Sequence, residues 1–554
     1  MKKAISLLLS LATVFGMSTL GACTTTTGGN NNVVVDDKTI NVRLYKAGYG
    51  DTFLYKFKEK FEEVYAAEGY KMNILNPTYD SMGPLMVQEM ARGYDNTKID
   101  LYITAGIKPN MVSNLGEYGE VAEDLTETVY NKSVIGYDKA ESAGTIKGMV
   151  EDTYLMPYVA ADNGKMYGFC WTQASAGMVV NRTKLETYGY TELPRTTKEM
   201  FSIFDKIYET SSTTKTYPIT YNLSNLSGGA SNYQDAAFHT WLAQFGVEEF
   251  NEFATMQTKN GSTRVDLEDG TEVFKNENIK TCLKAFAQLM DSKYAAYGSA
   301  TQDLDQAQGL IMKSSAKGNN AVFMPNGDWF LNEIKANYSN LDDIDFMNFP
   351  VISDIGVKYF GANTKYALSD DKCDELLSYI CKLVDENKTI SEMKSAVLAE
   401  KQIELDDSDI QAIASIRGLT YSRGADMVAY VTKGSTKKDI CSLVLRMMAS
   451  EDYAKTFVEH SNVSTPYAKV RSQSNYKFVQ STNALTSNNY FDAVTFFVSG
   501  LRYDVMKTFD SFPEIDNLPL TAHNNVKSYD AFAESIYNDG ITKITALWTA
   551  YKKN

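Results

Sequence analysis

The sequence predicts an α/β fold in which helices cover the faces of a parallel sheet. The order of its segments indicates the fold class, and its composition indicates a globular protein. From Thr39 onward, strand-like and helix-like segments alternate with the spacing of strand–helix–strand–helix–strand units. The 554-residue chain is 44% hydrophobic and 22% charged, as is typical of globular proteins. That length leaves room for more than one domain.

The first elements follow from the periodicity of the apolar residues. Residues 39–48 (TINVRLYKAG) begin as an alternating, β-prone strand. A helix is expected next, because apolar side chains recur on one helical face until Gly69 ends the pattern. The residues of that face are Phe53, Phe57, Phe61 and either Val64 or Tyr65.

Two more strands follow with a helix between them. Residues 70–77 (YKMNILNP) and 99–106 (IDLYITAG) are the strands, and residues 81–93 (SMGPLMVQEMARG) form the helix. Ligands of such sheets gather beyond the carboxyl ends of the strands. Those ends are residues 46–51, 77–81 and 104–106.

The N-terminus resembles a bacterial lipoprotein signal. Lys2 and Lys3 precede a mostly apolar segment, which ends at Leu20-Gly21-Ala22-Cys23, a match to the lipobox. Residues 1–22 are therefore expected to be the signal peptide, Cys23 the lipidated residue, and residues 23–38 a flexible tether. Cleavage of an ordinary secretory signal after Ala22 is the alternative, whereas the apolar run is short for a membrane span.

Charge and cysteine content exclude several function classes. The formal net charge of −15 disfavours nucleic acid and anionic membrane surfaces as partners. Apart from Cys23, the cysteines are an odd and scattered set, which argues against a disulfide framework. Cys373 and Cys381 are ~12 Å apart if helical, too far for a disulfide, and are expected to be core thiols. Three dispersed histidines provide no zinc motif, so no metal or cofactor is expected.

Three ordered motifs resemble the bacterial extracellular solute-binding proteins of family 1, the maltose-binding-protein-like group. The first is residues 162–207, with a turn at Asn163-Gly164, two strands and a Pro-Arg-Thr-Thr entry to a helix. Cys170-Trp171 departs from the family pattern, which usually has proline there. The second is AVFMPNGDWFLNEI at 321–334, which resembles the family's strand, tight turn and helix start. The third is residues 427–457, with a strand, a helix and a Ser-Glu-Asp helix cap.

The resemblance implies a two-lobed, type II periplasmic-binding-protein-like fold with a ligand cleft between lobes joined by a hinge. It runs with gaps over most of residues 39–468. Lobe 1 is expected to comprise 39–175 and 350–458, with an insertion at about 371–425. Lobe 2 is expected to comprise 176–349 and 459–554.

The resemblance also implies a receptor that delivers a solute to the permease of an ABC importer, and the lipid anchor would hold it at the extracellular face of the cell membrane. A sugar or oligosaccharide is the expected ligand, and the receptor is expected to act as a monomer and not as an enzyme. Sugars are bound by flat aromatic faces together with amide and carboxylate groups, and such pairing discriminates because an unmatched polar group is costly. The candidate ligand residues are Trp329, Asp328, Asn326, Trp171, Gln173, Tyr49, Asp51, Tyr79, Asp80 and Asn363, whereas Trp241 is expected to be core.

Two alternatives stay open from the sequence. The same fold could bind a peptide, polyamine, phosphate ester or metal, although the calcium-loop pattern at Asp303-Leu304-Asp305 lacks its required glycine and terminal glutamate. A secreted glycosidase is the other, because the chain's 69 acidic residues always allow a carboxylate pair to be imagined. The sequence contains no nucleophile elbow or phosphate-binding loop.

Overall fold

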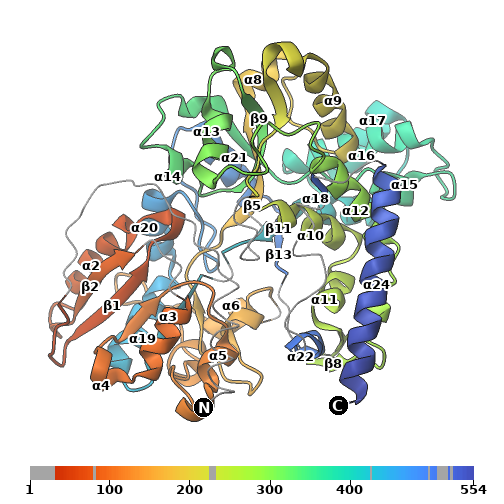
Figure 1. Cartoon of the computed structure of the whole chain (residues 1–554). Coiled ribbons are helices and arrows are strands. Elements are labelled where there is room, and N and C mark those ends of the chain that lie inside the picture. The colour runs from red at the N-terminus through yellow and green to blue at the C-terminus, as the bar shows by residue number, and fades with distance from the viewer. Residues whose placement is uncertain are drawn as a thin grey trace. The chain divides into compact units, whose positions relative to one another are not determined.

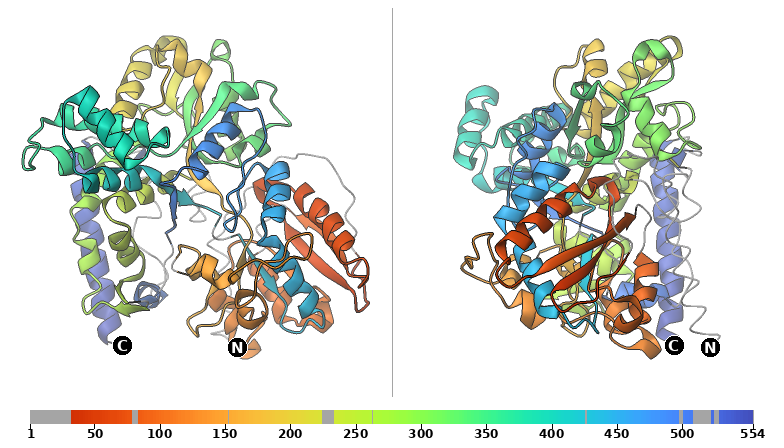
Figure 2. Two further views of the ribbon diagram at one scale, coloured as in Figure 1. Left: turned by 180° about the vertical axis from the view of Figure 1, so that it is seen from behind. Right: turned by 90° about the vertical axis from the view of Figure 1, so that its left-hand side faces the viewer.

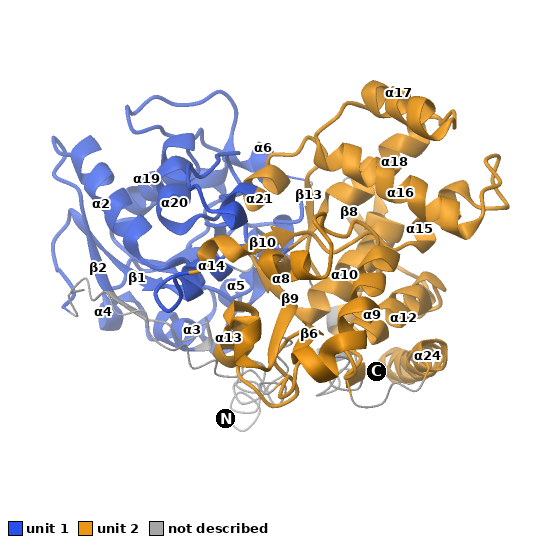
Figure 3. Cartoon of the chain, turned by 90° about the horizontal axis from the view of Figure 1, so that it is seen from above, with its two compact units in different colours: residues 1–175, 328–339, 422–480 blue, residues 176–327, 340–421, 481–554 orange. Residues whose placement is uncertain are grey.

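The computed structural model describes residues 32–78, 83–151, 153–223, 233–261, 263–424, 427–496, 500–507, 522–523 and 528–553. The chain divides into two units, coloured separately in Figure 3. Unit 1 comprises residues 1–175, 328–339 and 422–480, and unit 2 comprises residues 176–327, 340–421 and 481–554. The lipidation candidate Cys23, the signal segment and most of the tether lie outside the described residues.

Among its described residues, unit 1 is built on a five-stranded sheet in the order β2-β1-β3-β12-β4. The strands are β1 (Thr39–Tyr45), β2 (Lys71–Thr78), β3 (Leu101–Ile103), β4 (Phe169–Cys170) and β12 (Val428–Val431). β1 runs parallel to β2 and β3, as the sequence predicts, whereas β12 runs antiparallel to β3 and β4. The sheet is therefore mixed, and its antiparallel part comes from a segment far along the chain.

Helices of unit 1 bury the apolar faces that the sequence predicts. Phe53, Phe57 and Phe61 of α2 (Thr52–Val64) are fully buried. α2 lies beside α20 (Glu451–Ser461) in Figure 1, and Phe57 meets Tyr453 with ring centroids 5.0 Å apart. The other helices in the described part of this unit are η1 (Ala47–Tyr49), α3 (Gly83–Ala91), α4 (Tyr94–Thr97), α5 (Pro109–Ser113), η2 (Gly116–Tyr118), η3 (Thr126–Tyr130), α6 (Ile146–Val150), α7 (Met156–Val159), α14 (Phe330–Ile334) and α19 (Lys438–Met448).

A buried ion pair joins the sheet of unit 1 to the start of α19. Lys437 Nζ lies 3.0 Å from Asp100 Oδ2, and both side chains are almost completely shielded from solvent. Lys437 also donates to the Thr39 carbonyl at 2.6 Å, while Asp100 accepts from Asn41 N–H at 2.8 Å and from the Ser435 hydroxyl at 2.6 Å. The charges are thus paired and hydrogen-bonded, as buried charges require.

Unit 2 has a second mixed sheet, which among the described residues contains six strands. Its main order is β13-β11-β5-β9-β6, and β10 pairs with β5. The strands are β5 (Ser175–Asn181), β6 (Thr216–Ile219), β9 (Asn320–Gly327), β10 (Ile344–Met347), β11 (Leu419–Ser422) and β13 (Asp492–Val494). β9 is parallel to β6 and antiparallel to β5.

Helices surround this second sheet. Those preceding β10 are α8 (Arg182–Thr187), α9 (Thr197–Thr214), α10 (Gln234–Phe245), α11 (Val247–Thr255), η5 (Glu272–Phe274), α12 (Asn278–Leu289), α13 (Leu304–Met312), η6 (Ser315–Lys317) and η7 (Leu341–Asp343), with a hairpin of β7 (Gln257–Asn260) and β8 (Thr263–Asp266) among them. The later ones are α15 (Asp354–Phe360), α16 (Asp370–Asp385), α17 (Ile390–Lys401), α18 (Asp407–Gly418), α21 (Lys477–Thr486), α22 (Gly500–Lys507) and α24 (Tyr529–Lys553). α24 is the long C-terminal helix in Figure 2 and lies along α12, where Lys284 pairs with Asp530.

The local signals of the three sequence motifs are confirmed. α9 begins with a capping box between Thr196 and Glu199, and the Ser450 side chain caps α20. β9 leads through a turn into α14, as the second motif predicts. Asp303 caps α13 in a capping box with Gln306, so the acidic pattern there is a helix start.

The units differ from the expected lobes in three segments. Residues 350–421, expected in lobe 1, belong to unit 2, because the loop before α15 is hydrogen-bonded to the start of α9, with Val351 N donating to Arg195 O at 2.9 Å. The expected insertion therefore packs on unit 2, where Arg417 and Arg195 both pair with Asp385. Residues 328–339 and 459–480 belong to unit 1. Asn332 of the first segment donates to the Ser461 carbonyl of the second, and Ser464 accepts a hydrogen bond from Gln173 N–H.

The cysteines and the core tryptophan lie where the sequence places them. Cys170, Cys282, Cys373, Cys381 and Cys441 are free and buried. Trp241 is fully buried in unit 2 and donates its indole N–H to the Pro350 carbonyl at 2.9 Å. Those predictions are confirmed.

Candidate functional site

An aromatic cluster lies where β1 ends in unit 1. Its members are Tyr49, Phe53, Trp171, Trp329 and Phe457. Tyr49 belongs to η1 (Ala47–Tyr49), directly after β1, and its ring centroid is 5.4 Å from that of Trp171 and 6.5 Å from that of Trp329. Three residues expected at a sugar site from distant parts of the sequence therefore meet in one unit, at the carboxyl edge of the sheet.

Trp171 is buried within the aromatic cluster. It stacks on Phe53 with ring centroids 5.7 Å apart and an interplanar angle of 16°, and its indole N–H donates to the Thr104 carbonyl at 3.1 Å. Only 1% of its surface is exposed. This is the environment of a packing residue, and contact of Trp171 with a ligand stays a prediction.

Trp329 lies at the start of α14, against the glycine of η1. It is 5% exposed, and a Cβ built on Gly48 would lie 3.0 Å from Trp329 Cδ1 and 2.9 Å from Glu333 Oε1. A side chain at position 48 would crowd Trp329 and the flexible end of Glu333, and both would have to shift, so glycine suits this close approach. The α14 segment is held to unit 1 also by Asn332, which donates to the Ser461 carbonyl.

Asp328 is a buried carboxyl group with unused hydrogen-bonding capacity. Its Oδ2 accepts from Ser175 N–H at 3.0 Å, and its own N–H donates to the Ser175 carbonyl at the same distance. Oδ1 has no hydrogen-bond partner in the described part of the chain. Burial raises the pKa of Asp328 well above its ordinary value, because the charged form is desolvated. In its protonated form such a carboxyl group can both donate to and accept from a hydroxyl, whereas the carboxylate only accepts.

Gln173 lies near the point where the chain passes from unit 1 to unit 2. It is half-buried, and its N–H donates to the Ser464 carbonyl at 2.8 Å. Nearby, Arg423 N donates to the Ala174 carbonyl at 2.8 Å. The segments around residues 174, 423 and 464 are thus held together within unit 1.

Asp51 has a charged partner that the sequence did not indicate. Its carboxylate lies 2.8 Å from Lys46 Nζ, and both side chains are largely buried. The pKa of the neighbouring Tyr55 is raised, first by burial and then by the charge of Asp51. Lys46, Tyr49 and Asp51 all follow β1 within a few residues, so this loop supplies an aromatic ring and an ion pair.

Sequence reasoning also missed several buried hydroxyl groups in unit 1. Thr104 Oγ1, Ser422 Oγ and Thr465 Oγ1 are shielded from solvent and have no hydrogen-bond partner within the described ranges. Thr104 follows β3, and the other two adjoin the segments that hold Gln173. In the sequence only their positions near strand ends could have indicated them, and single threonines and serines occur at strand ends throughout any α/β chain.

The remaining predicted residues are not brought to this cluster by any described contact. Tyr79 and Asp80 lie outside the described residues. The sequence suggests that Asn363 precedes a strand, but in the structure it is exposed in unit 2, in the turn between α15 and α16, and precedes a helix. Asn326 is buried at the end of β9 in unit 2.

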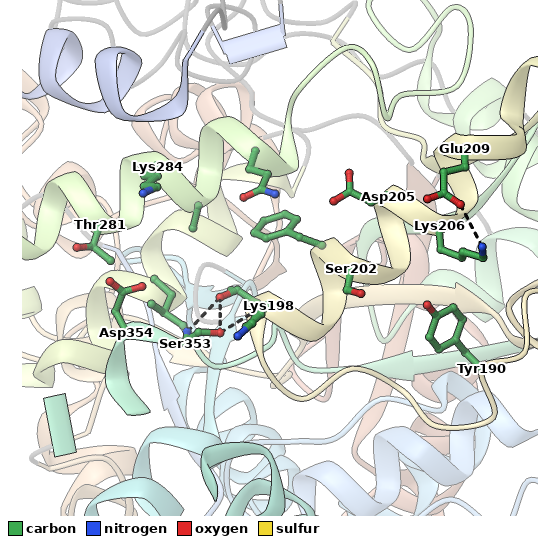
Figure 4. A pocket seen from close by; sticks show the side chains of 15 residues that line it. Tyr190, Lys198, Ser202, Asp205, Lys206, Glu209, Thr281, Lys284, Ser353 and Asp354 are labelled. Atoms are coloured by element: carbon green, nitrogen blue, oxygen red, sulfur yellow. Dashed lines mark hydrogen bonds and ion pairs between the residues drawn. The ribbon is translucent and has the colours of Figure 1, made fainter. Parts of the chain in front are cut away.

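A cavity of about 560 Å³ lies in unit 2, between α9, α12 and the start of α15 (Figure 4). None of the predicted ligand residues lines it. Its lysines are paired with acidic side chains: Lys198 with Asp371, Lys206 with Glu209 and Lys284 with Asp530. None of its lining residues is a tryptophan, and the charges of its lysines are paired, so it does not resemble a sugar site.

The described residues contain neither a metal site nor a membrane-spanning helix. No group of three or more His, Cys, Asp or Glu side chains there is placed to hold a metal ion. None of the helices in the same residues combines the length and hydrophobicity needed to cross a bilayer.

No known family model matches the sequence, and no curated protein matches it either. Several solved structures resemble the fold. A probable secreted solute-binding lipoprotein from Streptomyces coelicolor aligns with a TM-score of 0.52 at 12% identity, covering 91% of this chain and 98% of its own. A chitin oligosaccharide binding protein aligns with a TM-score of 0.51 at 12% identity, covering 91% and 100%.

A Streptococcus pneumoniae solute-binding protein in complex with the blood group A-trisaccharide aligns with a TM-score of 0.50 at 11% identity, covering 91% and 100%. At these identities the likeness shows the fold alone. The chain has the α/β fold of two-lobed solute-binding proteins. The fold class predicted from the sequence is confirmed.

Proposed function

We propose that this chain is a lipid-anchored extracellular substrate-binding protein of an ABC importer, which captures a sugar or oligosaccharide and delivers it to the permease. The observation that carries the proposal is the aromatic cluster at the end of β1, placed on the fold of solute-binding proteins. Tyr49 and Trp329 supply rings, while Asp328 supplies a buried polar group with an unused oxygen. Two of the similar structures are named for sugar ligands.

We propose that the ligand is held between the two units and that binding favours their approach. In such a receptor a ligand that contacts both units stabilises the closed form only by its differential affinity for that form. Membership in family 1 and anchorage through Cys23 rest on the sequence motifs. The anchor would keep the receptor beside its permease at the extracellular face of the membrane.

The sugar proposal is tested by the melting temperature of the chain from Thr24 onward, measured with mono- and oligosaccharides, amino acids and short peptides. The sugars include chitin oligosaccharides and the blood group A trisaccharide. Ligand at about 100 times its dissociation constant adds ~2.7 kcal/mol of stability, so one sugar class is expected to raise the melting temperature. A response to peptides or amino acids alone would contradict the sugar proposal.

A turnover assay distinguishes a glycosidase from a sugar receptor. Aryl glycosides incubated with the chain should release no phenol above the background rate. Sustained release that follows protein concentration would make the chain an enzyme. The non-sugar alternative is decided by the melting panel itself.

A further inference from the structure

Three amide side chains lie near the carboxyl ends of the parallel strands β6 and β9 in unit 2. The parallel strands β6 and β9 pair Ile219 with Phe323, so Asn222 and Asn326 each lie three residues beyond that pair on neighbouring segments. Gln234, the first residue of α10, donates its Nε2 to the Asn222 carbonyl at 3.1 Å. Residues distant in sequence are therefore adjacent at the carboxyl ends of two parallel strands, where open α/β sheets bind ligands.

Each of the three amides has a buried polar atom that is not used. Asn222 is 2% exposed, and Gln234 and Asn326 are fully buried. Asn222 Nδ2, Gln234 Oε1 and Asn326 Nδ2 have no hydrogen-bond partner among the residues that the structure describes. Folded proteins pair most buried polar atoms, because an unpaired one destabilises the fold. Three such atoms at one sheet edge need a reason.

The chemistry of the group is that of a neutral, hydroxylated ligand. Two amide nitrogens can donate and one amide oxygen can accept, which matches sugar hydroxyls that both accept and donate. In the described residues none of the three side chains is hydrogen-bonded to a charged group. An anion or cation would therefore find no opposite charge among these amides.

We infer that Asn222, Gln234 and Asn326 form a polar subsite in unit 2 that hydrogen-bonds the hydroxyl groups of the captured sugar. The inference rests on the proposed function, and it names two residues, Asn222 and Gln234, that the sequence motifs do not indicate. The cost of the unused atoms in the free protein is offset when the ligand pairs with them. Affinity and discrimination then come from the same groups.

The test uses Asn222→Leu, because it removes an unused donor and keeps the side-chain size. A ligand-binding role predicts at least a tenfold loss of affinity for the sugar that shifts the melting temperature of the wild-type chain. It also predicts unchanged or higher stability without ligand, since an unpaired polar group has been replaced by an apolar one. Calorimetric titration and melting of the free proteins measure the two effects. Asn326→Leu and Gln234→Met are expected to weaken binding in the same way.

Asn348→Leu is the matched control. Asn348 is a buried amide of unit 2 whose two ends are both used, donating to the Leu419 carbonyl at 3.3 Å and accepting from the Thr420 hydroxyl at 2.9 Å. Its replacement should lower stability and leave sugar affinity unchanged. If Asn222→Leu binds the sugar as the wild type does, the subsite is overturned while the sugar receptor stands. A wild-type chain that binds no sugar overturns both.

Discussion

Replacing Lys437 with methionine is expected to lower the free energy of unfolding by about 3–5 kcal/mol, which is the usual cost of leaving a buried charge unpaired. Methionine keeps the length of the side chain but removes the ammonium that faces Asp100 at 3.0 Å and the Thr39 carbonyl at 2.6 Å. Denaturant unfolding at pH 7 measures the loss.

The double variant Lys437→Met, Asp100→Asn is the control. Asparagine retains an oxygen for Asn41 N–H but carries no charge, so the double variant should recover part of the lost stability. Equal stabilities for the wild type and the single variant would show that the pair contributes nothing.

The contribution of Lys437 also has an expected pH dependence. Burial alone would lower the pKa of Lys437, but the hydrogen bond and charge of Asp100 outweigh it and raise the pKa above that of an ordinary lysine. A base with a raised folded-state pKa stabilises the fold fully below its unfolded pKa, and that contribution is lost as pH rises through the folded value. The difference in the free energy of unfolding between the wild type and Lys437→Met should therefore be constant near neutral pH. It should shrink only when the pH rises above the pKa of an ordinary lysine.

Replacing Trp329 with alanine is expected to weaken sugar binding at least about tenfold, or about 1.4 kcal/mol. The indole lies with Tyr49 at the end of β1, and its removal takes away the flat apolar face proposed to cover the sugar ring. Stability should also fall, by about 3–5 kcal/mol as for other buried aromatic truncations. Titration calorimetry on the folded protein at low temperature separates the two effects.

Trp241→Ala supplies the comparison, because Trp241 is an equally buried tryptophan in the core of unit 2. It should cost a similar amount of stability and leave the affinity of the folded protein unchanged. Trp329→Phe serves the same purpose if the alanine variant does not fold. Normal affinity in every Trp329 variant would remove this residue from the site.

The fold was largely predictable because its signals are local. The phenylalanine stripe of α2, the capping box at Thr196 and the strand–turn–helix at β9 are each written within about twenty residues. The antiparallel insertion of β12 and the placement of residues 350–421 in unit 2 depend on contacts between distant segments. Periodicity carries no information about such contacts.

The candidate site was predictable only in part, for the same reason. Tyr49, Trp171 and Trp329 were chosen as aromatic residues near strand ends, and the structure brings them together. The Lys46 partner of Asp51 and the unused amide atoms of Asn222 and Gln234 could not be seen, because pairing and burial are properties of the folded chain. An asparagine after a strand is ordinary until its nitrogen is found without a partner.

The measurement that tests the central claim most directly is small-angle X-ray scattering of the chain from Thr24 onward, with and without the sugar that raises its melting temperature. Capture between two units predicts a smaller radius of gyration at saturating sugar, and no change with sugars that leave the melting temperature unaltered. A sugar that binds at saturation without changing the radius of gyration would contradict capture by closure and would assign binding to one unit alone.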